Sequence, residues 1–255
     1  MKTIALNTGA KMPMVGLGTW KMSDAEAESS VRTALAAGYR HIDTATLYGN
    51  ERGVGTGIRG SGVPREEVFV TTKLWPTDFF SPEKAFEQSL KHLAVEYVDL
   101  YLVHWPIPLM PKSVWLAMEK LYKSGRAKAV GISNYGIGDI EKLLEYASVV
   151  PAVNQIKFSP FDYSEEILAC CASHNIIVEA YSPLTRGYQL NDATVVAVAK
   201  KYAKTPAQVM LRWCLEHHTV PLPKSTHAQR IEENANIFDF ELAREDIIAL
   251  DGLAG

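Results

Sequence analysis

The chain has 255 residues, of which 47% are hydrophobic and 22% charged, a composition typical of a globular protein with a large core. Its formal charge of −3 and isoelectric point near 6.2 give no overall basic field, which argues against nucleic acid or membrane surfaces and favours small-molecule partners. No apolar stretch reaches the roughly 18 residues that span a bilayer, and residues 1–13 lack the apolar run of a signal peptide, so we expect a cytoplasmic protein.

The N-terminal residues predict a β-hairpin and then a strand. Residues 2–13 contain two short runs around the turn sequence Asn7-Thr8-Gly9. Residues 15–20, VGLGTW, predict the next strand. If the later strands close into a barrel, the hairpin is placed to plug its N-terminal mouth.

The segment SDAEAESSVRTALAAG predicts a helix with defined ends. Ser23 suits the N-cap, Glu26 stands three residues later in the position of a capping box, and Gly38 follows the last turn. Two later helices are predicted to open at residues 81–82 and 205–206, where Ser or Thr is followed by a proline that suits the first helical turn.

Residues 55–60, GTGIRG, match the GxGxxG pattern of dinucleotide-binding loops. That motif needs a strand directly before it and a helix after it, but the preceding YGNERGV has no strand character. We therefore interpret the segment as part of a helix. Gly53, Gly55 and Gly57 weaken such a helix by about 1 kcal/mol each relative to alanine, and the sequence alone gives no reason for them.

One repeating unit organises the rest of the chain: a short apolar run that ends in a polar residue, followed by a longer amphipathic stretch. The polar ends are Asp43, Lys73, His104, Asn134, Gln155, Tyr181 and Lys224. They recur on average about every 30 residues, the size of one strand–helix–strand unit. With residues 15–20 they predict eight strands, and no linker interrupts them. We therefore expect a single domain over 1–255, folded as a TIM (β/α)8 barrel whose polar strand ends meet at one face; a doubly wound sheet is the alternative.

Four residues near the first strand ends suggest proton chemistry. Lys73 at the inner end of a buried strand needs a counter-charge, and Asp43 on the neighbouring strand can supply it. The same ammonium would lower the pKa of a nearby phenol such as Tyr48 toward neutrality, which suits a general acid for a carbonyl oxygen. His104 is placed to hold that oxygen. The alternatives are a purely structural Asp43–Lys73 pair and a core histidine at 104.

The last predicted strand offers a phosphate site. In PLPKSTHAQRIEEN, Lys224 and Ser225 stand at the strand end and the start of a helix, where free backbone N–H groups favour a phosphate. Arg230 lies six residues further on, and an arginine fork with a lysine can clamp a phosphomonoester such as the 2′-phosphate of NADP. A solvated basic surface is an equally good interpretation of this spacing.

The three cysteines indicate no disulfide framework and no metal site. Cys170 and Cys171 are neighbours, and no CxxC pattern occurs. We expect reduced thiols in the core.

Seven segments in series resemble the successive signatures of the aldo-keto reductase family: GYRHIDTATLYGNE, VTTKLW, VDLYLVHWP, GISNY, NQIKFSP, AYSPL and PLPKSTHAQRIEEN. The resemblance extends over nearly the whole chain. It implies a catalytic tetrad of Asp43, Tyr48, Lys73 and His104, with Tyr48 as the proton donor, and NADPH or NADP⁺ as the cofactor.

The resemblance also implies the binding residues. For the nicotinamide these are Ser133, Asn134 and Gln155, which hydrogen-bond its amide, and Tyr181, which stacks on its ring. For the rest of the cofactor they are Ser182 and Leu184 at the pyrophosphate, Lys224, Ser225, Thr226 and Arg230 at the 2′-phosphate, and Glu233 and Asn234 at the adenine. The substrate pocket would be walled by Trp20, Trp75 and Trp105. A single aromatic residue at a strand end commonly just packs a loop, but three of them favour a pocket.

The chain departs from many relatives in two places. After YSPL it continues as TRGYQLND, a shorter segment than the loop that covers the pyrophosphate in many relatives, so Arg186 either contacts an anion there or faces solvent. The sequence also ends soon after FDFELAREDIIALDGL, without a long C-terminal loop. We expect an open, permissive pocket.

These patterns predict a monomeric, NADP(H)-dependent reductase of aldehydes and ketones. One alternative is an aldolase-type lyase that forms a Schiff base on Lys73, although a lysine paired with Asp43 is a poor nucleophile. The other is a redox-sensing protein that binds the cofactor with little turnover.

Overall fold

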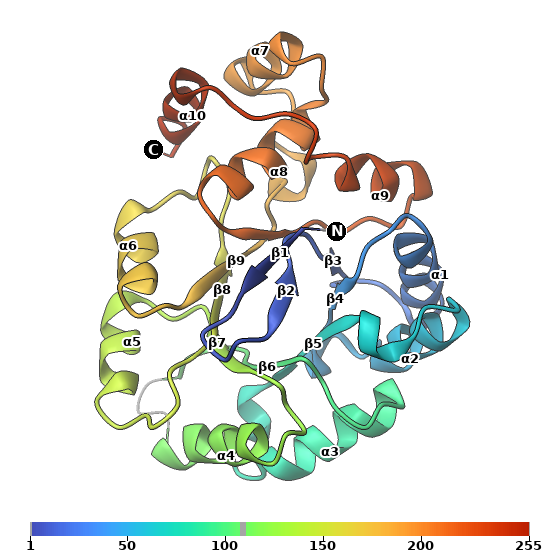
Figure 1. Ribbon diagram of the computed structural model, residues 1–255, viewed down its shortest axis with the longest axis vertical. Coiled ribbons are helices and arrows are strands. Elements are labelled where there is room, and N and C mark those ends of the chain that lie inside the picture. The colour runs from blue at the N-terminus through green and yellow to red at the C-terminus, as the bar shows by residue number, and fades with distance from the viewer. Residues whose placement is uncertain (1, 108–110, 255) are drawn as a thin grey trace.

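A computed structural model describes residues 2–107 and 111–254, and within them eight parallel strands form one nearly closed barrel (Figure 1). The strands are β3 (Leu17–Gly18), β4 (His41–Asp43), β5 (Phe69–Leu74), β6 (Leu100–Val103), β7 (Val130–Ser133), β8 (Val153–Lys157), β9 (Ile177–Tyr181) and β10 (Val220–Leu222). Neighbours in the sheet are neighbours in sequence, from β3 to β10. Two hydrogen bonds join the outer strands, from Gly16 N to Pro221 O and from Gly18 N to Pro223 O, both 3.1 Å. The predicted barrel is confirmed, and the doubly wound sheet is excluded.

Helices surround this barrel (Figure 1). They are α1 (Asp24–Ala36), α2 (Glu51–Gly60), α3 (Pro82–Leu93), α4 (Lys112–Lys123), α5 (Ile137–Leu144), α6 (Glu165–Ser173), α7 (Ala193–Lys201), α8 (Pro206–Glu216), α9 (Ala228–Ala235) and α10 (Arg244–Asp251). Ser23 and Glu26 form the predicted capping box of α1, and Thr205 and Gln208 form another at α8. No helix in the described ranges has both the length and the apolar character to cross a membrane.

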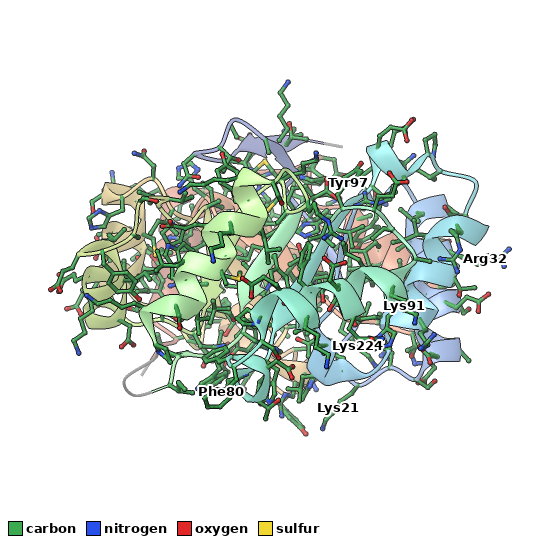
Figure 2. All side chains as sticks on the ribbon, turned by 90° about the horizontal axis from the view of Figure 1, so that it is seen from below. Lys21, Arg32, Phe80, Lys91, Tyr97 and Lys224 are labelled. Carbon is green, nitrogen blue, oxygen red and sulfur yellow. The ribbon has the colours of Figure 1, made fainter. Side chains whose placement is uncertain are left out.

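The N-terminal hairpin is present as β1 (Thr3–Ala5) and β2 (Lys11–Pro13), paired antiparallel. Met12 and Leu6 are buried in a cluster with Phe69, Leu100 and other residues from the first half of the strands, so the hairpin covers the N-terminal mouth. Figure 2 shows Lys21, Phe80 and Lys224 on the face opposite the hairpin.

The glycines of α2 are explained by close helix packing. A Cβ on Gly53 would lie 2.1 Å from the carbonyl oxygen of Asp24, and one on Gly55 would lie 2.2 Å from that of Leu93. Helix α2 therefore lies against the backbone of α1 on one side and of the C-terminal end of α3 on the other. The GxGxxG match belongs to this helix, as we interpreted it, and glycine is required there for space.

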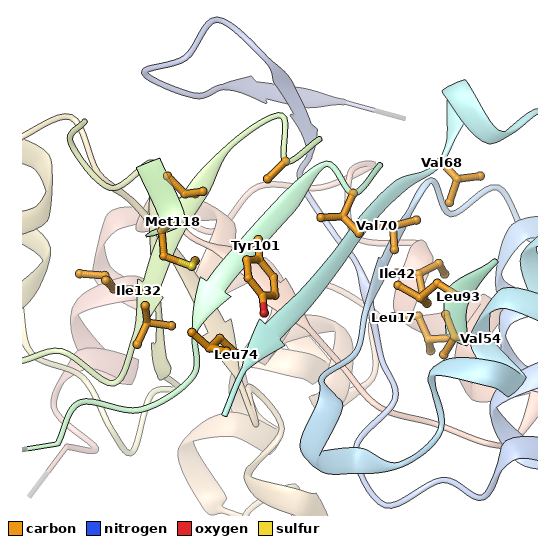
Figure 3. Packing of buried hydrophobic residues seen from close by; sticks show 14 of the residues in the cluster. Leu17, Ile42, Val54, Val68, Val70, Leu74, Leu93, Tyr101, Met118 and Ile132 are labelled. Carbon is orange, nitrogen blue, oxygen red and sulfur yellow. The ribbon is translucent and has the colours of Figure 1, made fainter. Parts of the chain in front are cut away.

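The core has two compartments because side chains of a strand alternate between faces. The outer face of the sheet packs against the helices, and Figure 3 shows Leu17 and Ile42 of the sheet near Val54 of α2 and Leu93 of α3. The side chains on the inner face are apolar next to the hairpin and polar toward the C-terminal mouth. This buried polar layer contains His41, Asp43, Lys73, Gln155 and Glu179.

The cysteines follow the prediction only in part. Cys171 and Cys214 are buried free thiols, whereas Cys170 is half-buried. Cys170 is less buried because the face of α6 that packs inward carries Cys171 instead.

Candidate functional site

The C-terminal mouth of the barrel brings together the four residues expected to do proton chemistry. Asp43 ends β4, Lys73 lies near the end of β5, and His104 follows β6 directly. Tyr48 ends the short 3-10 helix Thr46–Tyr48 that follows β4. The ring centroid of Tyr48 lies 5.2 Å from Lys73 Nζ and 5.7 Å from the His104 ring.

The expected Asp43–Lys73 pair is present and is fully enclosed. Lys73 is 0% exposed, and its Nζ lies 2.8 Å from each carboxylate oxygen of Asp43 and 2.8 Å from the carbonyl oxygen of Thr44. Burial by itself lowers the pKa of Lys73, but the charge of Asp43 and the neighbouring Tyr48 outweigh it and raise that pKa above its usual value. Lys73 therefore stays charged.

The expected lowering of the Tyr48 pKa is wrong for this structure. Burial raises the pKa of Tyr48 above its ordinary value of 10, and the charge of Lys73 opposes this without reversing it. Sequence reasoning identified the charge and omitted the desolvation of the phenol, which is the larger effect here. Tyr48 consequently holds its proton at neutral pH.

His104 is buried and neutral. Burial, helped by the charge of Lys73, lowers its pKa to about 3. Its Nδ1 is buried without a hydrogen-bond partner among the described residues, so it is not a satisfied core histidine. Trp75 contacts it in a T-shaped arrangement, with ring centroids 5.0 Å apart.

Three of the residues expected at the nicotinamide form a hydrogen-bonded row beside His104. Asn134, in the left-handed conformation with φ of 64°, donates from Nδ2 to the carbonyl oxygen of His104 and to Ser133 Oγ, at 3.1 and 2.9 Å. Tyr181 donates its hydroxyl to Asn134 Oδ1 at 2.8 Å. The row holds the Asn134 amide and the Tyr181 ring in fixed positions at the mouth.

Gln155 lies deeper than the other three. Its Nε2 donates to Asp43 Oδ2 and to Glu179 Oε2, both at 2.8 Å. Both of its amide hydrogens are thus committed inside the barrel, and only its carbonyl oxygen remains for a ligand.

Glu179 and His41 were not identified by the sequence patterns. Both side chains are fully buried in the barrel interior, with His41 Nε2 3.5 Å from Glu179 Oε1. A signal was present in IIVEAY, where strand alternation places Glu179 on the same face as the functional candidate Tyr181.

The segment after β9 has an unusual backbone. Ser182, Thr185 and Arg186 all have positive φ, at 53°, 47° and 56°, and Leu184 precedes the 3-10 turn Thr185–Gly187. The guanidinium of Arg186 lies over the ring of Trp20, 4.7 Å from its centroid. We call residues 182–187 the strap. Arg186 is exposed, as one of the two alternatives expected, and its guanidinium stacks on a tryptophan of the segment after β3.

The expected phosphate residues follow β10 on the same mouth. Lys224, Thr226 and Arg230 are exposed, whereas Ser225 is buried and accepts a hydrogen bond from the His227 backbone. Helix α9 begins at Ala228, three residues later than we expected, because Ser225 and His227 first form a turn. Within the described chain, the α9 N-terminus has no side-chain cap, so its N–H groups are open to an anion.

The two residues expected at the adenine differ in their contacts. Glu233 Oε1 accepts a hydrogen bond of 2.6 Å from Thr205 Oγ1, which ties α9 to the start of α8. Asn234 is buried one residue further along α9. Glu233 is therefore partly committed to packing.

The three tryptophans differ as well. Trp75 contacts His104, and Trp20 lies under the strap, with Lys21 Nζ also 4.6 Å from its ring centroid. Trp105 is 47% exposed at the rim. Trp75 is thus brought to the candidate site, and Trp20 and Trp105 lie at its margins.

A surface hollow of about 490 Å³ lies elsewhere, between the ends of α2 and α3. Its arginines are committed to the fold: Arg59 donates to the Leu93 carbonyl oxygen, and Arg65 to Asp99 and to the Tyr97 carbonyl oxygen. Tyr97, which lines it, lies toward the hairpin side of the barrel (Figure 2). The hollow contains none of the candidate residues, so the barrel mouth is the better candidate site.

Known proteins have similar sequences and the same fold. The sequence model of the Aldo/keto reductase family matches residues 13–254. A glyoxal reductase of Bacillus subtilis is 46% identical over 254 residues, which span 98% of this chain and 92% of the relative. The crystal structure of an aldo/keto reductase from Brucella melitensis superposes with a TM-score of 0.96 at 46% identity, covering 99% of this chain and 97% of that one.

A third relative carries a ligand. The crystal structure of an aldo-keto reductase from Bombyx mori in complex with NADP superposes with a TM-score of 0.93 at 37% identity, covering 99% of this chain and 92% of that one. With a family match along nearly the whole sequence and relatives of this identity and coverage, the chain belongs to the aldo/keto reductase family of carbonyl-reducing oxidoreductases.

Proposed function

We propose that this protein, acting as one domain, reduces aldehydes and ketones to alcohols with NADPH, and that Tyr48 donates the proton to the carbonyl oxygen. The observation that carries the proposal is the meeting of Tyr48 and His104 at the barrel mouth above a buried Asp43–Lys73 pair. NADPH, when bound, supplies a hydride to the carbonyl carbon. The named relatives support the substrate class, since one of them is a glyoxal reductase.

Tyr48 is suited to give a proton as charge develops on oxygen. Its pKa keeps it protonated at neutral pH, and the adjacent ammonium of Lys73 stabilises the phenolate that remains after transfer. The ammonium of Lys73 is held in place because it donates hydrogen bonds to the carboxylate of Asp43 and to the carbonyl oxygen of Thr44.

His104 positions the carbonyl oxygen. A neutral imidazole donates one hydrogen bond without a competing positive charge, and burial keeps this one neutral. Its ring makes edge-type contacts with the rings of both Trp75 and Tyr48. A carbonyl oxygen held between His104 and Tyr48 is within reach of the proton donor.

The residues at the mouth fit an NADP molecule. Support comes from the Asn134 amide and the Tyr181 ring, which hydrogen bonds hold in fixed positions at the mouth and which would hydrogen-bond to and stack on a nicotinamide bound there. Lys224 and Arg230 are exposed beside the uncapped N-terminus of α9, which suits a phosphomonoester. The strap follows β9 and Trp20 follows β3, so they flank the end of β10, the strand that leads to Lys224.

The Schiff-base lyase is disfavoured by the same geometry. All three ammonium hydrogens of Lys73 have acceptors, two on Asp43 and one on Thr44. A nucleophilic amine would have to lose one of these protons inside the barrel, against a raised pKa.

The test compares the wild-type protein with Tyr48→Phe. We expect NADPH oxidation with 4-nitrobenzaldehyde to fall by about 10²- to 10⁴-fold in the variant, because only the proton donor is lost. NADPH binding, followed by fluorescence, should change little. Tyr97→Phe, which alters a phenol near the hairpin side, serves as the control and should keep wild-type turnover. Equal turnover in Tyr48→Phe and the wild type would rule out this mechanism.

A further inference from the structure

Two buried carboxyl groups share one amide inside the barrel. Gln155 Nε2 donates one hydrogen to Asp43 and the other to Glu179, each at 2.8 Å. None of the three side chains has more than marginal contact with solvent. The carboxyl group of Glu179 is therefore linked to the Asp43–Lys73 pair through a single side chain.

The surroundings of Glu179 contain one positive charge for two acids. From β4 it faces His41 and Asp43, from β5 Lys73, and from β8 Gln155. The β10 residues paired with its end of β9 are apolar, Val220 and Leu222. Lys73 is already bound to both oxygens of Asp43, so an ionised Glu179 would be a second buried anion without its own counter-charge.

A neutral acid fits this position. Glu179 Oε1 has no hydrogen-bond partner among the described residues, and the nearest polar atom given for it is His41 Nε2 at 3.5 Å. His41 is neutral, because burial lowers its pKa to about 3. A proton on Oε1 would thus face His41 Nε2, the imidazole nitrogen that also has a hydrogen bond of 3.2 Å with Thr71 Oγ1. Burial and the charge of Asp43 raise the pKa of Glu179 to about 8, in agreement with this placement.

From this geometry we propose that Glu179 is a positioning residue of the reductase site. While Glu179 is a neutral acid, the positive charge of Lys73 acts on Tyr48. When Glu179 ionises, Tyr48 becomes a weaker proton donor. The inference rests on the proposed function. Its physical basis is that the charge of a deprotonated Glu179 offsets the ammonium of Lys73 in a medium that screens poorly. Less of that positive charge then stabilises the Tyr48 phenolate, so proton donation slows.

The experiment measures single-turnover NADPH oxidation with 4-nitrobenzaldehyde from pH 6 to 10, so that product release does not mask the chemistry. For the wild type we expect the rate to fall on the order of threefold to tenfold across an inflection near pH 8. In Glu179→Gln, whose amide resembles the neutral acid, this inflection should be absent. Glu119→Gln, a buried glutamate of α4 held by Ser148 and Val149, should keep it.

A second measurement uses the wild-type protein. Infrared spectroscopy should detect the carbonyl band of a buried protonated carboxyl group that disappears near pH 8, and Glu119→Gln should show the same band. Absence of that band, an inflection that persists in Glu179→Gln, or a folded Glu179→Gln that is inactive at every pH would each overturn the proposal. A wild type that oxidises no NADPH with any carbonyl would instead overturn the proposed function, whatever the infrared result.

Discussion

Lys73 and Asp43 form an ion pair in which one ammonium lies 2.8 Å from both oxygens of one carboxylate, within the closed barrel. The lysine side chain is 0% exposed and that of the aspartate 5%. Desolvation of two such charges is costly, and it is offset only while both partners are present. The pair therefore contributes to the stability of the fold, and the proposed function gives it a second role beside Tyr48.

Removal of one partner should destabilise the protein far more than removal of both. We expect Asp43→Asn to lower the free energy of unfolding by about 3–5 kcal/mol, because it leaves the Lys73 charge buried without a counter-charge. The double variant Asp43→Asn with Lys73→Met should recover most of this loss and remain inactive. Urea unfolding of the three proteins measures the effect. A double variant no more stable than Asp43→Asn would show that the pair is not the cause.

The loss of stability on replacing a glycine of α2 by alanine should depend on how close the neighbouring atoms lie. Gly53→Ala and Gly55→Ala place a Cβ 2.1 and 2.2 Å from a backbone carbonyl oxygen of a neighbouring segment, far inside van der Waals contact, so each should cost more than the roughly 1–3 kcal/mol typical of overpacking. Gly60→Ala is the matched control in the same helix. Its Cβ would meet Arg32 Nη1 at 3.6 Å, an ordinary contact, so it should be neutral or stabilise by up to about 1 kcal/mol. Thermal unfolding distinguishes the three, and a uniform effect would contradict the packing explanation.

The barrel and the Asp43–Lys73 pair were predictable because they depend on order along the chain. Polar residues at strand ends and capping residues such as Ser23 and Glu26 are read without knowing any distance between helices. The glycines of α2 depend on how close two helices approach, which no local pattern contains. The Tyr48 pKa depends on a sum of opposing effects, and the sequence showed only the charge of Lys73. Glu179 was overlooked because a single acidic residue within an apolar strand shows its role only once its partners are known.

The phosphate segment should set the preference between the two nicotinamide cofactors. If Arg230 binds the 2′-phosphate, Arg230→Ala should raise the Kd for NADPH by about ten- to hundredfold, the loss of one or two charge-assisted hydrogen bonds. The Kd for NADH, which has no 2′-phosphate, should stay within about twofold on the same grounds. Arg244→Ala, at the start of α10, removes an equal charge elsewhere and should change neither. Equal losses for NADPH and NADH in Arg230→Ala would place the phosphate at other residues.

The strap should slow release of the cofactor. Arg186 reaches from the segment after β9 to Trp20 after β3, and β10 lies between those strands, so the contact bridges the end of the strand that leads to Lys224. Arg186→Met keeps an extended side chain and removes the cation, which weakens the contact by about 0.5–1 kcal/mol. A loss of that size should make the release of NADPH, measured by stopped flow, about two- to fivefold faster. An unchanged rate would mean that the strap does not hold the cofactor, and Arg244→Met controls for the lost charge.

Stability should depend on pH through Glu179 and through the buried histidines, with opposite signs. The pKa of Glu179 rises from 4.5 to about 8 on folding, so the folded protein binds the extra proton between these values and its stability falls as pH rises through this window. The pKa values of His41 and His104 fall to about 3, so their contribution is present above pH 6.5 and is lost as the pH drops toward 3.

The difference between the wild type and Glu179→Gln isolates the first effect. We expect the stability of the wild type relative to the variant to decline between about pH 4.5 and 8, by at most about 1.4 kcal/mol per pH unit. The histidine contribution cancels in this difference, because both proteins retain His41 and His104. Urea unfolding at pH 5, 6, 7 and 8 gives the slope. A relative stability that rises with pH would mean that Glu179 is ionised in the folded protein, with the Asp43–Lys73 pair accommodating a second anion.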